Sequence, residues 1–173
     1  MGEIEAESPP LFRFEEMEDR HLQDVTDICN HYVLNSTSTF IVNPLSAAGM
    51  KETLTFDSPR HRSYVVMHGE EVCGYCFISP FKNRDAYADT AEVTVYLRPG
   101  FTGKGAGGLA VDFMEGEARQ RGFHCLIAVI CAENGPSIRL FEKKGFQRCA
   151  HYREVGRKFG RLLDVVVYQK IIS

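Results

Sequence analysis

The sequence predicts a single α/β domain, and two observations lead to this prediction. Segments with the apolar pattern of strands alternate along the chain with segments of helical period, and no repeat or linker interrupts them. The 173 residues are 44% hydrophobic and 25% charged, which suits one soluble domain with a full core. We therefore expect a domain over residues 11–173, preceded by a flexible tail at residues 1–10.

The first half of the domain is expected to contain two helices and a hairpin. Leu22, Val25 and Ile28 recur at helical spacing and mark the first helix. Two β-rich runs flank the segment His68-Gly69-Glu70-Glu71, a pattern typical of a hairpin. The expected elements are a strand at 11–15, helices at 20–34 and 46–56 with a Ser/Thr-rich turn at 35–40 between them, and strands at 64–67 and 72–78.

The second half follows a loop at 79–90 and alternates between strand and helix. The stretch 125–131 is an uninterrupted apolar run, typical of a strand that is buried on both faces. Gly122 and Gly145 each follow a helical pattern and are typical C-terminal stops. The expected elements are strands at 91–97, 125–131 and 162–171, and helices at 106–121 and 137–144.

The charge pattern excludes several classes of protein. The formal net charge is -3 with acidic and basic residues interspersed, so no basic stripe predicts nucleic-acid binding. No apolar run approaches the roughly 20 residues that cross a bilayer, and the acidic N-terminus lacks an apolar signal core. We expect a cytoplasmic protein with neither nucleic-acid nor membrane partners.

The six cysteines and six histidines show no paired metal-ligand spacing, so no metal site is predicted. Cys73 and Cys76 do form a C-x-x-C pattern. A redox pair would normally lie where a strand ends and a helix begins, whereas this pair falls inside a predicted strand. Structural thiols are the better interpretation.

Glycines crowd the junction between a predicted strand and a predicted helix, in the run Thr102-Gly103-Lys104-Gly105-Ala106-Gly107-Gly108. Glycine lets the backbone approach a ligand and adopt positive φ angles, and the helix start offers free N–H groups and a positive dipole end. The junction suits a phosphate or pyrophosphate, although a tight turn without a ligand can show the same glycines. Two nucleotide patterns fit poorly: the P-loop needs a hydroxyl residue where Gly105 stands, and the dinucleotide fingerprint needs an acid near position 125.

The same run resembles the coenzyme A-binding motif of the GNAT superfamily of N-acetyltransferases, Q/R-x-x-G-x-G/A. Gly105 and Gly107 match the two conserved positions of that motif, whereas Thr102 replaces its Gln or Arg. This departure removes a side chain that contributes to pyrophosphate binding and leaves the backbone cradle intact.

The resemblance extends beyond the loop. Residues 30–37, 90–97 and 153–160 are similar, in the expected order, to the group that acetylates phosphinothricin and methionine sulfoximine. Similarity covers nearly everything from Phe12 to Gln169. It implies a single-domain GNAT-like fold with a mixed, mostly antiparallel central sheet flanked by helices, and with strands that splay at the coenzyme A site. It also implies a homodimer, because the family is commonly dimeric.

The resemblance further implies that acetyl-coenzyme A is the co-substrate. The strand before the loop would pair with pantetheine through main-chain groups, chiefly at Val95 and Leu97, and the Val95 N–H could donate to a developing oxyanion. Asn134 and Ser137 match the family's N-x-x-S; from the residues alone they are a helix cap and a first helical turn. The implied cofactor-binding residues are Val93, Val95, Tyr96, Leu97, Thr102, Gly103, Lys104, Gly105, Ala106, Gly107, Gly108, Asn134 and Ser137.

Glu92 matches the family's proposed general base, which is needed because acetyl transfer to an amine requires an ammonium proton to leave. An unperturbed glutamate titrates near ~4.3, so direct deprotonation requires a raised pKa or a relaying water. Many family members carry a tyrosine as general acid where this chain has Phe141, which has no proton to donate. Tyr96 and Tyr152 are then the candidates for that role.

The implied acceptor is the α-amine of a small L-amino acid or analogue. Residues 81–87 resemble the group's substrate loop, in which an arginine pairs with the acceptor carboxylate through its planar fork. We assign this role to Arg84, with Tyr87 and Phe40 shaping the pocket and Lys158 completing the pocket or the subunit contact. Two alternatives are a non-catalytic acyl-coenzyme A-binding module and an enzyme of the same family with another amine acceptor.

Overall fold

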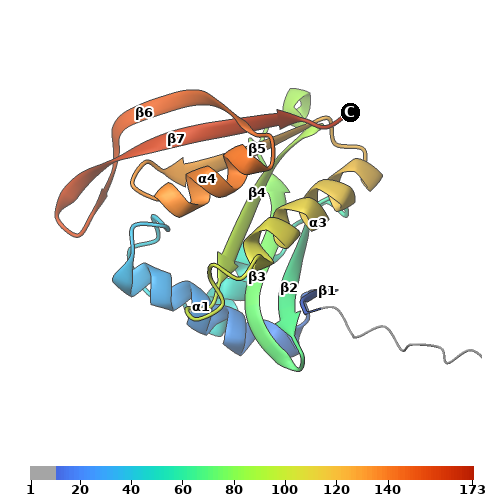
Figure 1. The fold of residues 1–173 in the computed structure, drawn as a ribbon, viewed down its shortest axis with the longest axis vertical. Helices are drawn as coiled ribbons and strands as arrows, with labels where there is room; N and C mark the ends of the chain where they lie inside the picture. Colours follow the sequence, from blue (N-terminus) through green and yellow to red (C-terminus); the bar gives the residue numbers. More distant parts are fainter. Residues whose placement is uncertain (1–10) are drawn as a thin grey trace, which may run out of the picture.

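The computed structural model describes residues 11–173 and contains one seven-stranded sheet with strand order β1-β2-β3-β4-β5-β7-β6 (Figure 1). The predicted tail at residues 1–10 lies outside the described residues. The strands are β1 (Arg13–Glu16), β2 (Arg62–His68), β3 (Glu71–Pro80), β4 (Thr90–Leu97), β5 (Cys125–Cys131), β6 (Gln147–Lys158) and β7 (Arg161–Ile171). The helices are α1 (Leu22–Asn35), α2 (Ala47–Leu54), α3 (Ala106–Gln120) and α4 (Gly135–Lys143), with 3-10 turns η1 (Asp19–His21) and η2 (Asp85–Tyr87).

The sheet is mixed, as predicted: β4 and β5 are parallel, and every other neighbouring pair is antiparallel. Helices cover both faces. α3 and α4 pack on one face through a large cluster that spans β2 to β7, whereas α1 and α2 pack on the other face over β2 and β3. The predicted hairpin joins β2 to β3, and Gly69 takes the positive φ of +59° that its turn requires.

The helix starts follow from local chemistry. The Ser46 hydroxyl accepts a hydrogen bond from the Gly49 N–H and caps α2, and the Asn134 side chain accepts from the Ser137 N–H at 3.2 Å and caps α4. Pro136 occupies the first turn of α4, where its missing N–H costs nothing. The sequence interpretation of Asn134 and Ser137 as cap and first turn is therefore confirmed.

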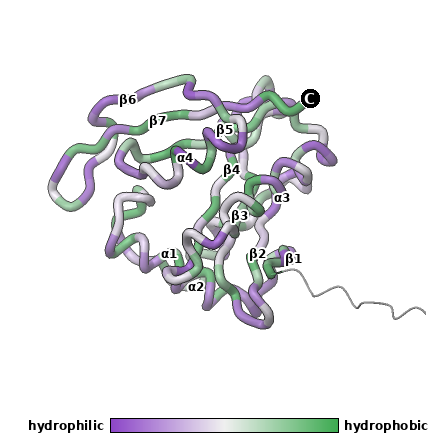
Figure 2. The backbone as a smooth tube through the Cα atoms, in the orientation of Figure 1, coloured by the Kyte–Doolittle hydropathy of each residue, from purple (hydrophilic) through white to green (hydrophobic). Residues whose placement is uncertain are grey.

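One strand was not predicted from the sequence. β6 forms a long ribbon with β7, yet of its residues only Lys158 is buried. Figure 2 shows hydrophilic colour along much of β6. Because an edge strand with two exposed faces needs no apolar alternation, the pattern that marks a half-buried strand is missing. The other predicted elements are present, with ends that differ by at most two residues.

The strands β4 and β5 splay apart, as predicted. They pair only at Thr90–Glu92 with Cys125–Ile127, and from there each strand keeps only its outer partner. β4 continues along β3 to the pair Leu97 and Gly74, while β5 continues along β7 to the pair Cys131 and Val165. The second half of each strand is therefore left with one free edge facing the other.

Candidate active site

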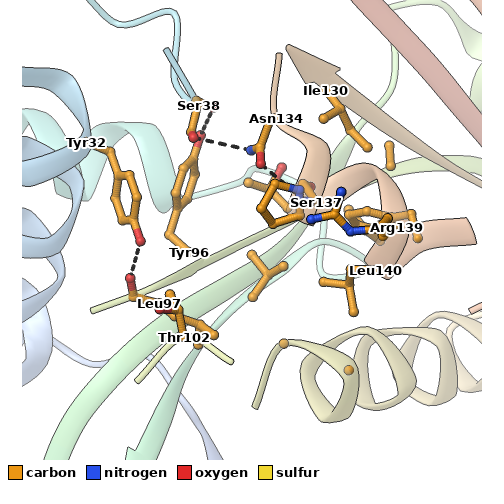
Figure 3. A pocket seen from close by; sticks show the side chains of 18 of the residues that line it. Tyr32, Ser38, Tyr96, Leu97, Thr102, Ile130, Asn134, Ser137, Arg139 and Leu140 are labelled. Atoms are coloured by element: carbon orange, nitrogen blue, oxygen red, sulfur yellow. Dashed lines mark hydrogen bonds between the residues drawn. The ribbon is translucent and has the colours of Figure 1, made fainter. Parts of the chain in front are cut away.

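The divergence of β4 and β5 opens a cavity of about 610 Å³ (Figure 3). Residues of β4, the loop after it, β5 and α4 line this cavity. Every residue predicted to bind the cofactor lines it except Lys104 and Ala106. Ala106 is fully buried in the core, and the Lys104 ammonium lies 5.2 Å from the ring centroid of Phe101.

The glycine loop forms an open cradle at one wall of this cavity. Gly103 and Gly105 have φ angles of +73° and +87°, which L residues rarely adopt, and a Cβ on either would meet nothing within 4 Å. α3 starts at Gly105 without a side-chain cap, and among residues 11–173 no acceptor takes the N–H groups of residues 106–108. Free N–H groups at the positive end of a helix fit a phosphate or pyrophosphate.

The last two glycines of the loop have a packing role. A Cβ on Gly107 would lie 3.2 Å from the Leu140 side chain, and one on Gly108 would lie 3.2 Å from the Lys144 side chain. Both glycines therefore allow α3 to lie close to α4, which forms the opposite wall of the cavity.

A chain of hydrogen bonds holds the far end of the cavity (Figure 3). The Asn134 Nδ2 donates to the Ser38 Oγ at 3.2 Å, and the Tyr96 hydroxyl donates to the Ser38 carbonyl at 3.1 Å. On β4, the Leu97 carbonyl accepts from the Tyr32 hydroxyl at 2.5 Å. The segment after α1 is in this way tied to β4 and to the start of α4.

A second cavity of about 270 Å³ adjoins the first. Ser38, Thr94, Tyr96 and Val129 line both cavities, so these residues form the junction. Glu92 and Phe40, predicted as base and as acceptor contact, both line the second cavity. Its walls are otherwise apolar, aromatic, thiol or hydroxyl side chains, and Glu92 is the single charged residue in the lining.

The Glu92 side chain is half-buried on β4 and lines the second cavity. Burial raises its pKa above the usual value, because water is partly excluded and the charged form is disfavoured. Its carboxylate has no hydrogen bond or ion pair with any side chain among residues 11–173. A raised pKa is one of the two conditions predicted from the sequence for deprotonation by Glu92, the other being a relaying water.

Phe40 is positioned by β6. Its ring lies against Gly156, where a Cβ would collide with the ring carbons. Gly156 follows an irregular part of β6 in which Glu154, at φ +53°, donates its N–H to the Asp164 carboxylate at 2.8 Å. The unpredicted strand thus packs against Phe40, which lines the second cavity.

Three further residues predicted for the acceptor line neither cavity. Arg84 is exposed at the start of η2 in the β3–β4 connection. The Tyr87 ring packs edge-on against the Phe81 ring, with 5.6 Å between the ring centroids. Lys158 is buried, and its ammonium donates to the carbonyls of Tyr32, Ser36 and Thr39 at 3.4, 2.7 and 2.9 Å. Lys158 therefore holds the segment between α1 and Phe40.

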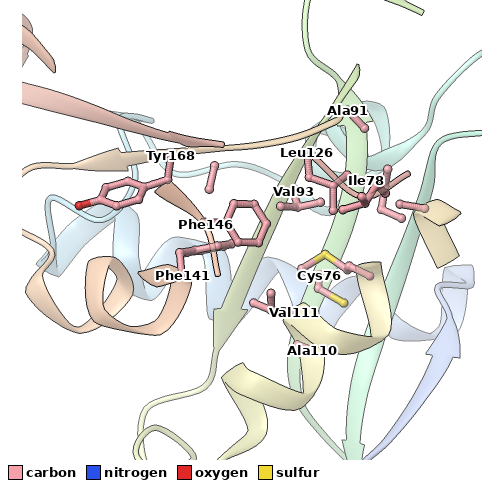
Figure 4. Close-up of a cluster of buried hydrophobic side chains, with 14 of the residues drawn as sticks. Cys76, Ile78, Ala91, Val93, Ala110, Val111, Leu126, Phe141, Phe146 and Tyr168 are labelled. Atoms are coloured by element: carbon pink, nitrogen blue, oxygen red, sulfur yellow. The ribbon is translucent and has the colours of Figure 1, made fainter. Parts of the chain in front are cut away.

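The proton donors near the junction differ from the family pattern. Phe141 is buried in the main cluster, where its ring packs 5.0 Å from that of Phe146 (Figure 4). Tyr96 lies at the junction, and burial raises its pKa to about 12, so its hydroxyl is protonated at neutral pH. Tyr152 is exposed on β6 and lines neither cavity.

Several residues of the two cavities were missed in the sequence. Ser38 belongs to a Ser/Thr-rich segment that predicted only a turn. Tyr32 was predicted only to lie on the apolar face of the first helix. Thr94 was hidden because it alternates with the predicted strand residues beside it. Arg139 lines the first cavity from α4 and had no distinguishing motif.

The thiols of the C-x-x-C pattern are free, buried and in separate hydrophobic clusters. Burial raises the pKa of Cys73 to about 11 and that of Cys76 further above its usual value, so both thiols stay protonated. Over residues 11–173 no group of three or more His, Cys, Asp or Glu side chains is placed to hold a metal ion. Within the same range no helix is long and apolar enough to span a bilayer.

The fold and the site are those of an acetyltransferase. Two parallel strands splay apart within a mixed sheet, and a glycine cradle lies at the start of the helix that follows the first of them. Residues 26–146 match the acetyltransferase (GNAT) family. The chain belongs to this family and is an N-acetyltransferase.

The relatives of the chain indicate which group of acetyltransferases it resembles. A phosphinothricin N-acetyltransferase of Streptomyces coelicolor is 35% identical over 156 residues, 88% of this chain and 91% of that protein. An L-methionine sulfoximine/L-methionine sulfone acetyltransferase of Salmonella typhimurium is 33% identical over 148 residues, 84% of this chain and 85% of that protein. The solved structure of a GNAT phosphinothricin acetyltransferase from Sinorhizobium meliloti in complex with acetyl-coenzyme A superposes with a TM-score of 0.90 at 29% identity, covering 95% of this chain and 90% of that one.

Proposed function

We propose that this enzyme transfers acetyl directly from acetyl-coenzyme A to the α-amine of a small L-amino acid or analogue, of the methionine sulfone, methionine sulfoximine or phosphinothricin type. The observation that carries the proposal is the junction of the two cavities. A cavity with a phosphate cradle meets a smaller cavity whose single charged side chain is a carboxylate with a raised pKa. Two substrates in these cavities would meet beside Tyr96 and Thr94.

The proposed reaction forms one C–N bond and breaks one thioester C–S bond. An acceptor that enters as an ammonium loses two protons; one ends on the thiol sulfur and the other leaves through Glu92 to water. Glu92 would take the first proton, and the Tyr96 hydroxyl, which lines the junction, would donate to the sulfur and recover a proton from the acceptor nitrogen. No covalent enzyme intermediate is needed.

The cofactor residues fit acetyl-coenzyme A. The open glycine cradle and the free N–H groups of residues 106–108 would hold the pyrophosphate, and the free edge of β4 at Val95 and Leu97 would pair with pantetheine. Asn134 and Ser137 would contact the coenzyme near the start of α4. When bound, the coenzyme supplies an activated acetyl group.

For the acceptor, Arg84 would reach the second cavity from the β3–β4 connection to bind the carboxylate, and Tyr87 and Phe40 would shape the pocket. Lys158 contributes by holding the segment that carries Phe40. We further propose a cytoplasmic homodimer, with the projecting part of the β6–β7 ribbon as the subunit contact. That part of the ribbon exposes Tyr152, Val155, Phe159 and Leu162.

One assay tests the proposal. Coenzyme A release is measured with methionine sulfone, methionine sulfoximine, phosphinothricin and a general amine panel, after binding of acetyl-coenzyme A has been confirmed by calorimetry. We expect turnover with at least one amino-acid analogue. Silence across every amine despite confirmed coenzyme binding would overturn it.

A different amine acceptor is the second candidate, and one observation favours it: no cationic side chain lines the second cavity. An acceptor without a carboxylate, such as a polyamine, would need none. Arg84→Ala separates the two candidates. It should raise the KM of an amino-acid acceptor with little change for acetyl-coenzyme A, whereas the KM of an acceptor without a carboxylate should not change.

A further inference from the structure

Among residues 11–173, Arg139 of α4 is the one charged side chain that lines the first cavity. Among residues 11–173 its guanidinium has no ion pair and no hydrogen bond. On the neighbouring helix α3 and just after it, by contrast, Arg119 pairs with Glu115 and Arg121 pairs with Glu117. Arg139 therefore offers a full, uncommitted positive charge to whatever enters the cavity.

The opposite wall lacks such a charge. Thr102 stands at the position where the coenzyme A motif carries Gln or Arg, and Figure 3 shows Thr102 and Arg139 on different walls of the cavity. The glycine cradle supplies only N–H groups and the partial charge of a helix dipole. Coenzyme A carries a pyrophosphate and a 3′-phosphate, and a guanidinium fork matches phosphate oxygens in charge and geometry.

The local backbone lets the side chain point toward the cavity. Side chains on a helix lean toward its N-terminus, so Arg139 lies over residue 135, four positions earlier. That residue is Gly135, and a Cβ there would lie 3.0 Å from the Arg139 Nη1. The missing Cβ thus leaves space for the guanidinium beside Asn134 and Pro136, which line the same cavity.

From these three observations we propose that Arg139 binds a phosphate of the coenzyme and supplies the cationic contact that Thr102 does not provide. Gly135 has a positioning role, because it leaves the space in which the guanidinium lies. The proposal rests on the use of coenzyme A put forward above, and it adds a residue on another element to the predicted set.

Calorimetric binding of three ligands tests it: coenzyme A, dephospho-coenzyme A and pantetheine. Because one charge-assisted contact is lost at a partly exposed site, Arg139→Ala should weaken coenzyme A binding about tenfold. Binding of pantetheine, which has no phosphate, should not change. If dephospho-coenzyme A is weakened as much as coenzyme A, the contact is to the pyrophosphate; if it is not weakened, the contact is to the 3′-phosphate.

Two controls guard the interpretation. Lys143→Ala removes a cation from the same helix that does not line the cavity, so it should leave all three affinities unchanged. Thr102→Arg in the Arg139→Ala background should restore much of the lost affinity for coenzyme A. Gly135→Ala should weaken coenzyme A binding in the wild type but add no further loss once Arg139 is gone.

The outcomes are distinguishable. Failure of the wild type to bind coenzyme A would overturn the proposed function itself. Wild-type binding that Arg139→Ala leaves unchanged, or a variant that loses pantetheine as much as coenzyme A, would overturn only the role of Arg139.

Discussion

Glu92 is a half-buried carboxylate, and its burial costs stability. Its pKa is raised, so at neutral pH the folded state holds a charge that the unfolded state would solvate better. No side chain among residues 11–173 compensates that charge with an ion pair. Such uncompensated carboxylates cluster at sites of proton transfer.

The pH dependence of the rate tests Glu92. A base acts deprotonated, so kcat/KM should fall as pH falls through the pKa of Glu92, which lies above that of an ordinary glutamate. Glu92→Gln should lower kcat by about 10²–10⁴-fold, flatten this acidic limb and leave coenzyme A affinity unchanged. It should not destabilise the fold, because it removes a poorly solvated charge.

Glu70→Gln is the matched control, since the Glu70 side chain is fully exposed and far along the β2–β3 hairpin. It should leave rate and pH profile unchanged. An acidic limb that survives intact in Glu92→Gln would show that another group acts as the base.

At the scale of elements, the junction of β4 and α3 combines two devices. β4 is held by β3 along its whole length but by β5 over only three residue pairs, which frees its edge. α3 then starts at a glycine with positive φ and no side-chain cap, which frees its first N–H groups. A helix without a side-chain cap is less stable, and its free N–H groups can bind an anion.

A pair of glycine substitutions within this one helix tests that trade. Gly105→Ala places an L residue at φ +87° and should cost about 1–2 kcal/mol of unfolding free energy, with weaker coenzyme A binding. Gly116 lies inside α3 at ordinary φ with nothing within 4 Å of a Cβ, so Gly116→Ala should stabilise by about 0.5–1 kcal/mol without changing affinity. Urea unfolding and calorimetry measure both quantities. Equal effects of the two variants would contradict the role of Gly105.

At the scale of the whole molecule, the sequence predicts what depends on local pattern. The apolar run of β5 and the glycines after β4 could be recognised because burial and positive φ restrict residue type directly. Contacts between distant segments leave no such mark. The Lys158 ammonium donates hydrogen bonds to the carbonyls of Thr39 and Ser36, which are 119 and 122 positions away in the sequence. The Asn134 side chain donates to the Ser38 hydroxyl, 96 positions away. The geometry of the second cavity therefore emerges only from the folded chain.

The β6–β7 ribbon extends beyond its pairing with β5. Beyond the pair Cys131 and Val165 it leaves β5 and continues as two strands alone. This projecting part carries the exposed apolar side chains of Tyr152, Val155, Phe159 and Leu162, and its inner edge holds Phe40 through Gly156. Apolar side chains gathered on a projecting ribbon indicate a contact with another chain, and a second copy would pair the same surface by two-fold symmetry.

We therefore expect the wild type to be a dimer by light scattering coupled to size exclusion, and Val155→Asp to be monomeric because it would bury a charge at the contact. Leu11→Asp is the control: Leu11 is 60% exposed and Val155 58%, but Leu11 lies beside β1 at the opposite end of the strand order. It should stay dimeric. Since Gly156 of the ribbon packs against Phe40, which lines the second cavity, the monomer should show a raised KM for the acceptor and an unchanged KM for acetyl-coenzyme A. A wild-type monomer, or a Val155→Asp dimer, would mean that the exposed ribbon serves the single chain alone.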